Sequence, residues 1–368
     1  MTTLKNINYS PRLTQHLVTS KIFASEPFIV VDIGARGGFA KYWSLYGDQI
    51  KLVGFEADAE ECERLNQQSA KCGHHFYPVA LHQNKGRKPF YITAYSPSSG
   101  FYQPDMTEVG RFPDKVNLAV EKTLDIDTMD FDSFASENGF DYVDFIKLDT
   151  EGAELDILKG ATRFLKKSVI GLSVEVWFQR WHKKQPFFSD IDLFLRPLGF
   201  KLFDLAINRS SREALPVPTA SLIPGPTERG QVYCGQALFL RDGANEIETS
   251  SSLEGGWDDI KILKLASIME LFRLPDCAIE LIQVASRKDF LKKEDSGSLI
   301  DLLVPPVGDK IVSYNEYLDY VRTVKDRASS PNIQRTKRLA VRFVPQFIRR
   351  IILRILVEIR DLINKIIK

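Results

Sequence analysis

The chain has 368 residues, of which 44% are apolar and 26% charged, enough for about two folded domains. Its 24 Phe, 12 Tyr and 4 Trp supply a large core, which excludes intrinsic disorder, and four scattered Cys exclude a disulfide scaffold and fit reduced thiols. The net charge of +1 is uneven: residues 331–368 carry ten Lys or Arg and two acidic residues, a net +8, which leaves −7 for residues 1–330.

Residues 1–25 are predicted to be an N-terminal arm. They lack the charged head and apolar run of a signal peptide, and no stretch of about eighteen residues in the chain is both apolar and uncharged. We therefore expect a cytoplasmic protein without a membrane-spanning helix. A peripheral position at the inner face of the membrane stays open.

Apolar strand-like runs alternate with segments of helical periodicity over residues 26–242. This alternation predicts an α/β domain with a doubly wound, mostly parallel sheet of seven strands and helices on both faces. A short final connection favours an antiparallel last strand. Strands are predicted at 28–32, 51–56, 75–80, 142–149, 169–176, 200–205 and 232–240, and helices notably at 59–71, 153–166 and 188–195.

The remaining segments are predicted to be loops and a small all-helical part. Residues 206–230 contain four Pro and little periodicity, which favours a loop over the sheet edge. The small, polar residues 243–256 are typical of a linker. A helical segment is predicted for 257–330, with helices at 257–274, 275–287 and 311–327, the second beginning at Pro275.

A glycine-rich turn follows the first predicted strand in VVDIGARGGF, residues 30–39. Glycine lets a backbone approach a ligand closely, and a helix N-terminus is expected beyond it. Arg36 stands where a dinucleotide-binding turn needs its second glycine, which excludes that fingerprint. Asp32 repels a pyrophosphate and attracts a cation, so the spacing indicates S-adenosylmethionine, whose sulfonium and ammonium are both positive. A tight connection without a ligand is the alternative.

Acidic residues end two further predicted strands. Glu56 follows Asp32 by 24 residues, at a position where an acid accepts hydrogen bonds from ribose hydroxyls in dinucleotide folds. Asp149 and Glu151 end the strand predicted at 142–149. The carboxyl ends of parallel strands face the ligand crevice of an open α/β sheet, so these acids are expected to meet there.

The runs DIGARGG, FEADAE, IKLDTEGAELDILKGA and LSVEVW resemble, in order, the motifs of the FkbM-type methyltransferases. This S-adenosylmethionine-dependent family has the Rossmann-like class I methyltransferase fold and methylates hydroxyl oxygens, and the similarity covers about residues 28–240. It implies that Asp149 and Glu151 lie beside the transferred methyl group. Arg36 and Ala57 depart from the Asn and Pro common in the family. The expected cofactor-binding residues are Asp32, Gly34, Ala35, Gly38, Glu56, Ala57 and Asp149.

A base near the acceptor hydroxyl should speed methyl transfer roughly 10²–10⁴-fold, and the catalytic candidates are Asp149, Glu151, Glu175 and His182. Crowded carboxylates raise one another's pKa toward the working pH. Glu151 as a helix cap, Glu175 as the partner of an Arg and His182 as a solvent-facing loop residue are the alternatives. The spacing of the acids matches no metal motif, so no metal is expected.

Two further segments bear on the acceptor. Trp177, Phe178 and Trp181 follow the fifth predicted strand, where their faces suit a sugar ring or simply pack in the core. Residues 95–111 are polar, long and punctuated by Gly and Pro, as in loops that close over a reaction.

The tail at 331–368 is basic, and its residues 343–368 have apolar side chains at helical spacing with Arg and Lys offset from them. Such a helix suits an anionic membrane surface, or docks on its own domain or in a homodimer. Bulky Ile and Leu alternate with the basic residues, and the rest of the chain is acidic. Both observations argue against binding to nucleic acid.

The sequence therefore predicts an S-adenosylmethionine-dependent O-methyltransferase that acts on a small-molecule or glycan acceptor, with a saccharide or lipid-linked glycan favoured by the resemblance. An NAD or nucleotide-sugar oxidoreductase is disfavoured by the glycine spacing. A catalytically silent scaffold or membrane-associated binding protein is the alternative from another class.

Overall fold

The computed structural model describes residues 4, 6–69, 74–216, 227, 230–250, 253–292 and 294–329. Two compact units make up the chain, Met1–Leu303 and Val304–Lys368. Within the described residues, no helix combines the length and the apolar composition needed to cross a membrane.

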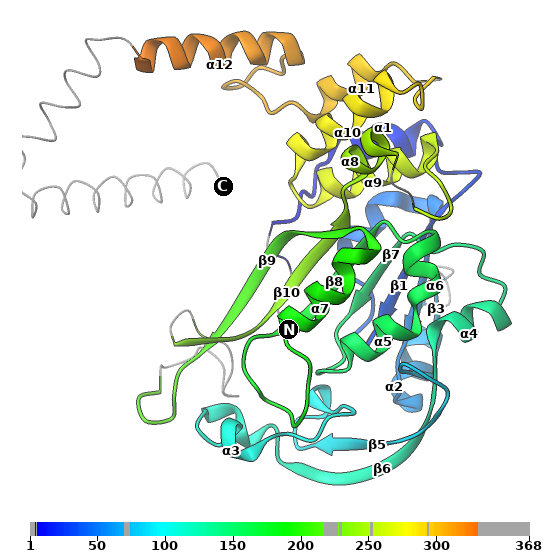
Figure 1. Ribbon diagram of the computed structural model, residues 1–368, viewed down its shortest axis with the longest axis vertical. Helices are drawn as coiled ribbons and strands as arrows, with labels where there is room; N and C mark the ends of the chain where they lie inside the picture. The colour runs from blue at the N-terminus through cyan, green and yellow to red at the C-terminus, as the bar shows by residue number, and fades with distance from the viewer. Residues whose placement is uncertain are drawn as a thin grey trace, which may run out of the picture. The chain divides into compact units, whose positions relative to one another are not determined.

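The first unit is built on a seven-stranded sheet with the strand order β3-β2-β1-β7-β8-β10-β9 (Figure 1). The strands from β3 to β8 run parallel, whereas β10 runs antiparallel to both of its neighbours. The predicted sheet and its antiparallel last strand are thus confirmed. The strands are β1 Phe28–Ile33, β2 Ile50–Phe55, β3 His75–Tyr77, β7 Phe145–Leu148, β8 Gly171–Trp177, β9 Phe200–Ser210 and β10 Gln231–Arg241.

Four helices cover one face of this sheet: α4 Phe131–Glu137, α5 Glu154–Gly160, α6 Thr162–Lys167 and α7 Phe188–Leu195. Their apolar side chains form the main core with β1, β7 and β8, which read as nearly unbroken apolar runs because both faces of the sheet are buried. The single helix predicted at 153–166 is divided into α5 and α6. A Cβ at Gly160 would lie 2.5 Å from the carbonyl oxygen of His82, so the chain comes close to another segment at this division.

The opposite face is covered by η1 Lys41–Gln49, α1 Arg12–Thr19 and α9 Asp259–Leu271. Trp43 in η1 meets Phe145 in β7 at a ring distance of 5.2 Å, and the fully buried Lys264 in α9 lies 3.0 Å from the Asp144 carboxylate. The predicted N-terminal arm and the start of the predicted helical segment therefore belong to the same unit as the sheet. Figure 1 shows α1, α8, α9 and α10 gathered at one end of this unit.

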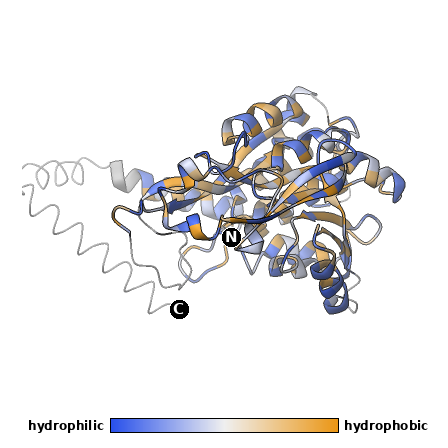
Figure 2. Ribbon diagram, turned by 90° about the horizontal axis from the view of Figure 1, so that it is seen from below, coloured by the Kyte–Doolittle hydropathy of each residue, from blue (hydrophilic) through white to orange (hydrophobic). Residues whose placement is uncertain are grey.

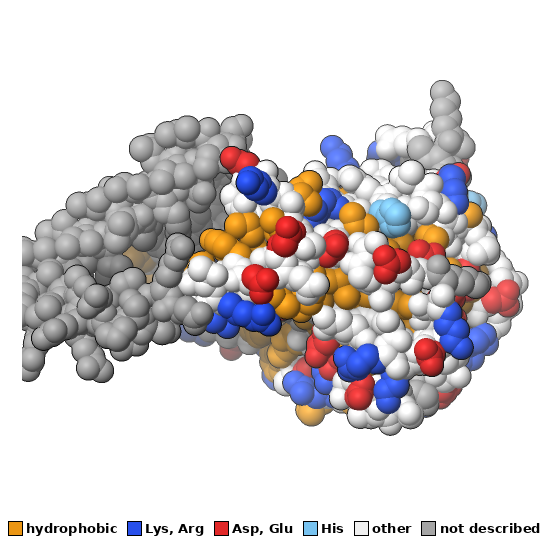
Figure 3. All heavy atoms as spheres, turned by 90° about the horizontal axis from the view of Figure 1, so that it is seen from above, with side chains coloured by type: hydrophobic (Ala, Val, Ile, Leu, Met, Phe, Trp, Pro, Cys, Tyr) orange, Lys and Arg blue, Asp and Glu red, His pale blue; other side chains and the backbone are white. Residues whose placement is uncertain are grey.

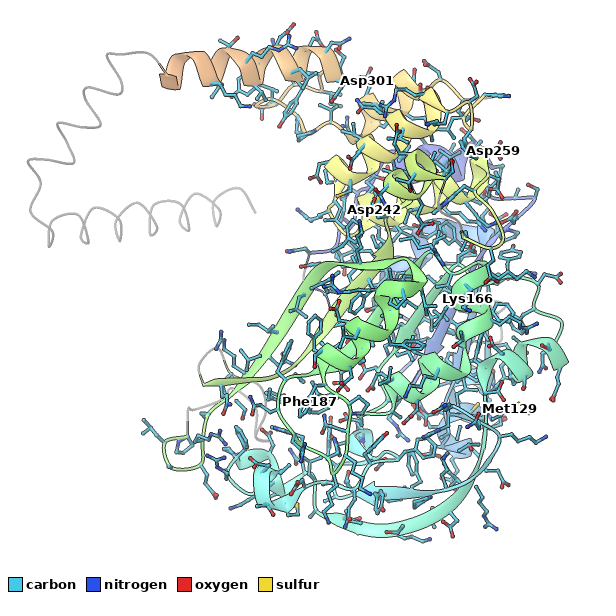
Figure 4. The ribbon with its side chains drawn as sticks, viewed as in Figure 1. Met129, Lys166, Phe187, Asp242, Asp259 and Asp301 are labelled. Atoms are coloured by element: carbon cyan, nitrogen blue, oxygen red, sulfur yellow. The ribbon has the colours of Figure 1, made fainter. Side chains whose placement is uncertain are left out.

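Part of the predicted linker at 243–256 is helical instead. Helix α8, Gly243–Thr249, begins after Asp242, whose side chain accepts a hydrogen bond from the backbone N–H of Asn245 at 3.2 Å. Asp242, labelled in Figure 4, lies beyond the end of β10, and Ala244 and Ile247 are buried. This short helix leads to α9, then α10 Pro275–Arg287 and α11 Ser296–Leu303, and α10 begins at the predicted Pro275. Figure 2 shows hydrophobic and hydrophilic residues interspersed along the ribbon of the described residues.

A second, three-stranded sheet was not predicted from the sequence. It has the order β4-β6-β5 and comprises β4 Ala80–Leu81, β5 Gly86–Thr93 and β6 Val120–Met129. β5 and β6 pair antiparallel, with Phe90 opposite Leu124. The predicted loop at 95–111 lies between β5 and β6 and contains η2 Ser96–Ser98 and α3 Met106–Val109, with η3 Pro113–Val116 after it.

The other elements follow the predictions more closely. Helix α2 spans Ala59–Ser69, and β9 continues to Ser210, into the segment predicted as a loop. In the second unit α12 spans Tyr314–Ser329. The amphipathic helix predicted at 343–368 lies outside the described residues. On the face seen in Figure 3, Lys or Arg and Asp or Glu side chains are interspersed.

Candidate functional site

A cavity of about 350 Å³ lies at the carboxyl ends of β1, β2 and β7. The strand order reverses at β1, whose neighbours are β2 and β7, and ligands of open α/β sheets bind at such a point. The volume is in the range of small-molecule sites. The second sheet forms an apolar wall through Phe90, Ile92, Leu124 and Ile126, and the loop after β5 adds Ser96, Pro97, Ser99 and Phe101.

The glycine turn after β1 forms part of the cavity lining. Gly34 has φ +78°, and a Cβ there would lie 2.0 Å from the carbonyl oxygen of Asp149, so only glycine allows this approach. The backbone N–H groups of Gly34 and Ala35 each donate to the carbonyl oxygen of Phe55 at 3.0 Å. The turn is therefore fixed against both neighbouring strands.

Glu56 lines the cavity directly after β2 and is buried. Its Oε1 accepts a hydrogen bond from the Asp58 N–H at 2.9 Å, and its Oε2 lies 3.8 Å from Nε of Arg36. Burial raises the pKa of Glu56, although the Asp58 N–H and Arg36 oppose this. Arg36 also contacts Asp58 at 2.7 Å, so the residue that departs from the family pattern lies between two carboxylates at the cavity.

Asp32 does not line the cavity but is paired with a lysine beneath it. Lys147 Nζ lies 3.0 Å from Asp32 Oδ1, 3.5 Å from Asp149 Oδ2 and 3.2 Å from the carbonyl oxygen of Gly34. Of the two acids, only Asp149 is a lining residue. Burial raises the pKa of Asp32, and Lys147 opposes that rise.

A cluster of acidic side chains begins at Asp149. Glu151 lines the cavity and has the left-handed φ of +57°, a strained conformation for a side chain of this type. Burial raises the pKa of Glu151 well above its usual value, and Asp149 and Glu154 raise it further. Burial also raises the pKa of Glu175, in β8, well above its usual value, and Glu151 and Asp149 raise it further.

Glu154 stabilises the turn before α5 through its side-chain carboxylate. Its Oε1 accepts hydrogen bonds from Thr150 N–H at 2.8 Å, from the Thr150 hydroxyl at 2.9 Å and from Gly152 N–H at 3.3 Å. Burial raises the pKa of Glu154 to about 7. The helix cap given as the alternative for Glu151 is absent, because the N-cap of α5 is Ala153 and no side chain caps it. Glu175 Oε2 has no hydrogen-bond partner among the described residues.

His182 is buried rather than solvent-facing. Its Nδ1 lies 3.1 Å from Gln185 Oε1, which also accepts from the His182 backbone N–H, and the ring meets Trp177 edge-on at 5.3 Å. Burial lowers the pKa of His182 to about 4, so the ring is neutral near pH 7. A Cβ on Gly152 would lie 3.7 Å from Nδ1, so His182 adjoins the acidic turn without lining the cavity.

The aromatic residues after β8 are packed in a core. Trp177 and Trp181 are 3% and 4% exposed and share a cluster with Phe112 and Tyr233, the latter stacked on Trp181 at 4.3 Å. Phe178 packs on Phe188 at 5.6 Å. Core packing, the second of the two predicted roles, therefore accounts for these rings.

The loop between β5 and α3 is anchored over the acidic turn. The Tyr102 hydroxyl donates to Asp156 Oδ2 at 2.5 Å, and His82 Nε2 lies 3.5 Å from the same oxygen. A Cβ on Gly100 would lie 3.3 Å from Glu151 Cβ. Phe101, next to Tyr102, lines the cavity. The hydrogen bond from Tyr102 to Asp156 therefore holds this part of the cavity wall in place.

The structure thus brings together only part of the predicted site. Ala35 packs in a small core with Cys62, and Gly38 lines a different hollow. Sequence reasoning missed Lys147, whose signal was a lysine inside an otherwise apolar strand run. It also missed Glu154, Asp156 and the β5–β6 wall. The predicted residues that line the cavity are Gly34, Glu56, Ala57, Asp149 and Glu151, and those that do not are Asp32, Ala35, Gly38, Glu175 and His182.

Among the described residues, no group of three or more His, Cys, Asp or Glu is arranged to hold a metal ion.

Comparison with known proteins identifies one family. Residues 32–202 match the family model described as the methyltransferase FkbM domain, a range that contains the glycine turn, Glu56, the acidic turn and β8. No curated protein matches the chain.

Solved structures give distant likenesses. A magnesium protoporphyrin IX methyltransferase from Synechocystis PCC 6803 with bound SAM is 11% identical, with 63% of this chain and 80% of that chain covered and a TM-score of 0.31. The N-methyltransferase NodS from Bradyrhizobium japonicum is 8% identical, with coverage of 62% and 93% and a TM-score of 0.29. The N-terminal domain of EvdMO1 with SAH bound is 10% identical, with coverage of 64% and 82% and a TM-score of 0.29.

Proposed function

Residues 32–202 of this chain form a methyltransferase FkbM domain, and on that premise we propose that the protein transfers a methyl group from S-adenosylmethionine to a hydroxyl oxygen of a saccharide or lipid-linked glycan. The observation that carries the proposal is the cavity at the strand ends, with the Gly34 turn, Glu56 and Asp149 on one side and the apolar β5–β6 wall on the other. The catalytic domain is proposed to span residues 26–242.

The lining residues fit this donor. Glu56 offers a buried carboxylate to ribose hydroxyls, in the position where the sequence predicted it. Apolar side chains such as Val79, Leu81 and Phe101 suit a flat base. Asp149 supplies a carboxylate for a sulfonium.

When bound, S-adenosylmethionine supplies an electrophilic methyl carbon on a positively charged sulfur. Glu151 would accept the proton of an acceptor hydroxyl held beside that carbon, which would leave the oxygen free to take the methyl group. Its raised pKa suits a proton acceptor for a very weak acid, and it is the catalytic candidate with a raised pKa that also lines the cavity. Burial, Asp149 and Glu154 keep that pKa high, and Phe101, next to the anchored Tyr102, forms part of the cavity wall.

His182 is the weaker candidate for the base. Its pKa is lowered to about 4 and its Nδ1 is engaged by Gln185, whereas the acidic turn adjoins the cavity directly. The support for a saccharide acceptor is the motif resemblance, since the rings after β8 are packed away from the cavity.

Two measurements test the proposal. Calorimetry should detect S-adenosylmethionine binding, and radiolabelled methyl transfer should be followed over extracted glycans and lipid-linked saccharides. Glu151→Gln is expected to bind the donor but lose transfer, while Glu137→Gln, on the exposed side of α4, retains both. Binding without transfer to any acceptor would favour a silent scaffold, and binding of NAD in place of the donor would favour an oxidoreductase.

The tail is proposed to act outside the active site. The basic, amphipathic residues 343–368 suit an anionic membrane surface at the inner face of the cytoplasmic membrane, or a homodimer partner. Both roles would bring a cytoplasmic enzyme close to lipid-linked acceptors or to a second copy.

A further inference from the structure

Lys147 holds the two acidic strand ends of the site together. Asp32 and Lys147 are direct neighbours in the β1–β7 register, and Nζ spans from Asp32 Oδ1 at 3.0 Å to Asp149 Oδ2 at 3.5 Å. The ammonium also donates to the Gly34 carbonyl oxygen at 3.2 Å. One cation therefore connects the carboxyl ends of β1 and β7 with the glycine turn.

Asp32 and Asp149 contribute two carboxylates and Lys147 one ammonium, so one carboxylate is in surplus. Burial lowers the pKa of Lys147, but Asp32 and Asp149 outweigh it and raise that pKa above its usual value, so the ammonium stays charged. Asp32 and Asp149 are 8% and 10% exposed, and Lys147 is closer to Asp32. Since Asp32 is balanced and does not line the cavity, the surplus negative charge is on Asp149, which does.

We propose that Lys147 is a positioning residue that neutralises Asp32 and directs the one surplus carboxylate, Asp149, at the positively charged sulfur of the methyl donor. This inference rests on the proposed function. It assigns to Lys147 a part in donor selectivity: the charged S-adenosylmethionine is attracted by the cavity floor, whereas its neutral thioether product, S-adenosylhomocysteine, is not. The loss of that attraction after transfer favours product release.

The alternative is that Asp32, predicted from the sequence to be a cofactor-binding residue, contacts the donor's ammonium group directly. The two ideas differ in the ratio of the dissociation constants for S-adenosylhomocysteine and S-adenosylmethionine. Both compounds carry the ammonium, so loss of a direct contact weakens both equally. S-adenosylhomocysteine carries no charge on sulfur, whereas S-adenosylmethionine does. A change in the charge of the cavity floor therefore alters the ratio of their dissociation constants.

The test is calorimetry with both compounds on the full chain at low salt. Asp32→Asn leaves Lys147 to balance Asp149, and the ratio should fall about tenfold toward unity. Adding Lys147→Met to Asp32→Asn removes the cation, restores the surplus of one carboxylate and should return the ratio to the wild-type value, although both affinities are lower because Asp149 has lost its support. Both replacements are neutral and of similar size, so Asp32→Asn alone leaves Lys147 paired with Asp149, while the double variant leaves Asp149 without its cation and is therefore checked for folding.

The control adds Lys51→Met, an exposed lysine of β2, to Asp32→Asn and should not restore the ratio. An unchanged ratio in Asp32→Asn, or no recovery in the double variant with native circular dichroism and cooperative melting, overturns the role of Lys147. Failure of the wild-type protein to bind either compound overturns the proposed function instead.

Discussion

The α-carbon of Gly34 approaches Asp149 so closely that a Cβ on the glycine would lie 2.0 Å from the aspartate's carbonyl oxygen. The contact joins the turn after β1 to the end of β7, the two strands at which the sheet order reverses. The cavity floor therefore requires a residue without a side chain at position 34, as well as its charged side chains.

Replacing Gly34 should consequently be far more damaging than replacing the neighbouring Gly37. Both residues have positive φ, +78° and +83°, but a Cβ at Gly37 meets nothing within 4 Å. Gly37→Ala is expected to cost about 1–2 kcal/mol of unfolding free energy through its backbone conformation alone. Gly34→Ala adds the clash, so thermal melting should show a larger loss, together with loss of donor binding. Equal melting temperatures for the two variants would contradict this.

Glu56→Gln tests the ribose contact. A hydrogen bond to a charged group contributes about 1.5–3 kcal/mol, so donor affinity should fall roughly 10–100-fold in calorimetry. The melting temperature should change little because the amide oxygen still accepts from the Asp58 N–H. Glu60→Gln, exposed in the first turn of α2, is the control and should bind as the wild type does. Normal affinity in Glu56→Gln would remove this contact from the site.

The activity should rise with pH. The pKa of Glu151 is raised well above its usual value by burial and by Asp149, and the side chain accepts a proton only when it is ionised. The single-turnover transfer rate should therefore increase as pH rises through that pKa, instead of being constant above pH 5. Glu151→Gln should abolish the rise and reduce the rate about 10²–10⁴-fold.

Glu137→Gln, exposed in α4, should keep the pH profile of the wild type. A pH profile for Glu151→Gln that still follows the wild type at a similar rate would transfer the role of base to another residue, with Glu175 the next to replace.

Tyr102→Phe should open one wall of the cavity. The lost hydrogen bond to Asp156 measures 2.5 Å and involves a carboxylate, so the anchored loop loses about 1.5–3 kcal/mol of closure. The donor's KM should rise about tenfold or more, and limited proteolysis in the loop at 95–105 should become faster. Tyr95→Phe, whose side chain is exposed, should leave both unchanged. Wild-type KM and proteolysis in Tyr102→Phe would show that the anchor does not hold the wall.

The tail makes a separate prediction. Flotation with vesicles of anionic phospholipid should recover the full chain, and recovery should fall on removal of residues 331–368 and on raising the salt concentration. Equal flotation of both proteins would end the membrane proposal, and sedimentation of the full chain as a dimer would favour the homodimer.

Local sequence was sufficient for the main sheet because its central strands β1, β7 and β8 are buried on both faces and therefore appear as short apolar runs. It failed for β5 and β6, which cover a cavity on one side and face solvent on the other, and whose charged residues resemble those of a loop. It also failed at 243–256, where the cap by Asp242 and the burial of Ile247 outweigh a small, polar composition.

In the site, the order of motifs predicted Glu56 and Asp149 at the carboxyl ends of two strands, which the structure places on either side of β1. The role of Asp32 was more difficult, because a carboxylate next to a glycine turn has the same sequence whether it faces a ligand or a lysine. Lys147 is 115 residues away along the chain and adjoins Asp32 only through the β1–β7 register.

The sequence alone determined the fold class, the family resemblance and the strand ends that carry acidic residues, because these follow from hydrophobic periodicity and from short motifs. Only the tertiary structure decided which acids line the cavity, which is balanced by Lys147, and that Glu154 stabilises the turn before α5. Those outcomes depend on burial and on distances between side chains of different strands, and such contacts leave no pattern along the chain.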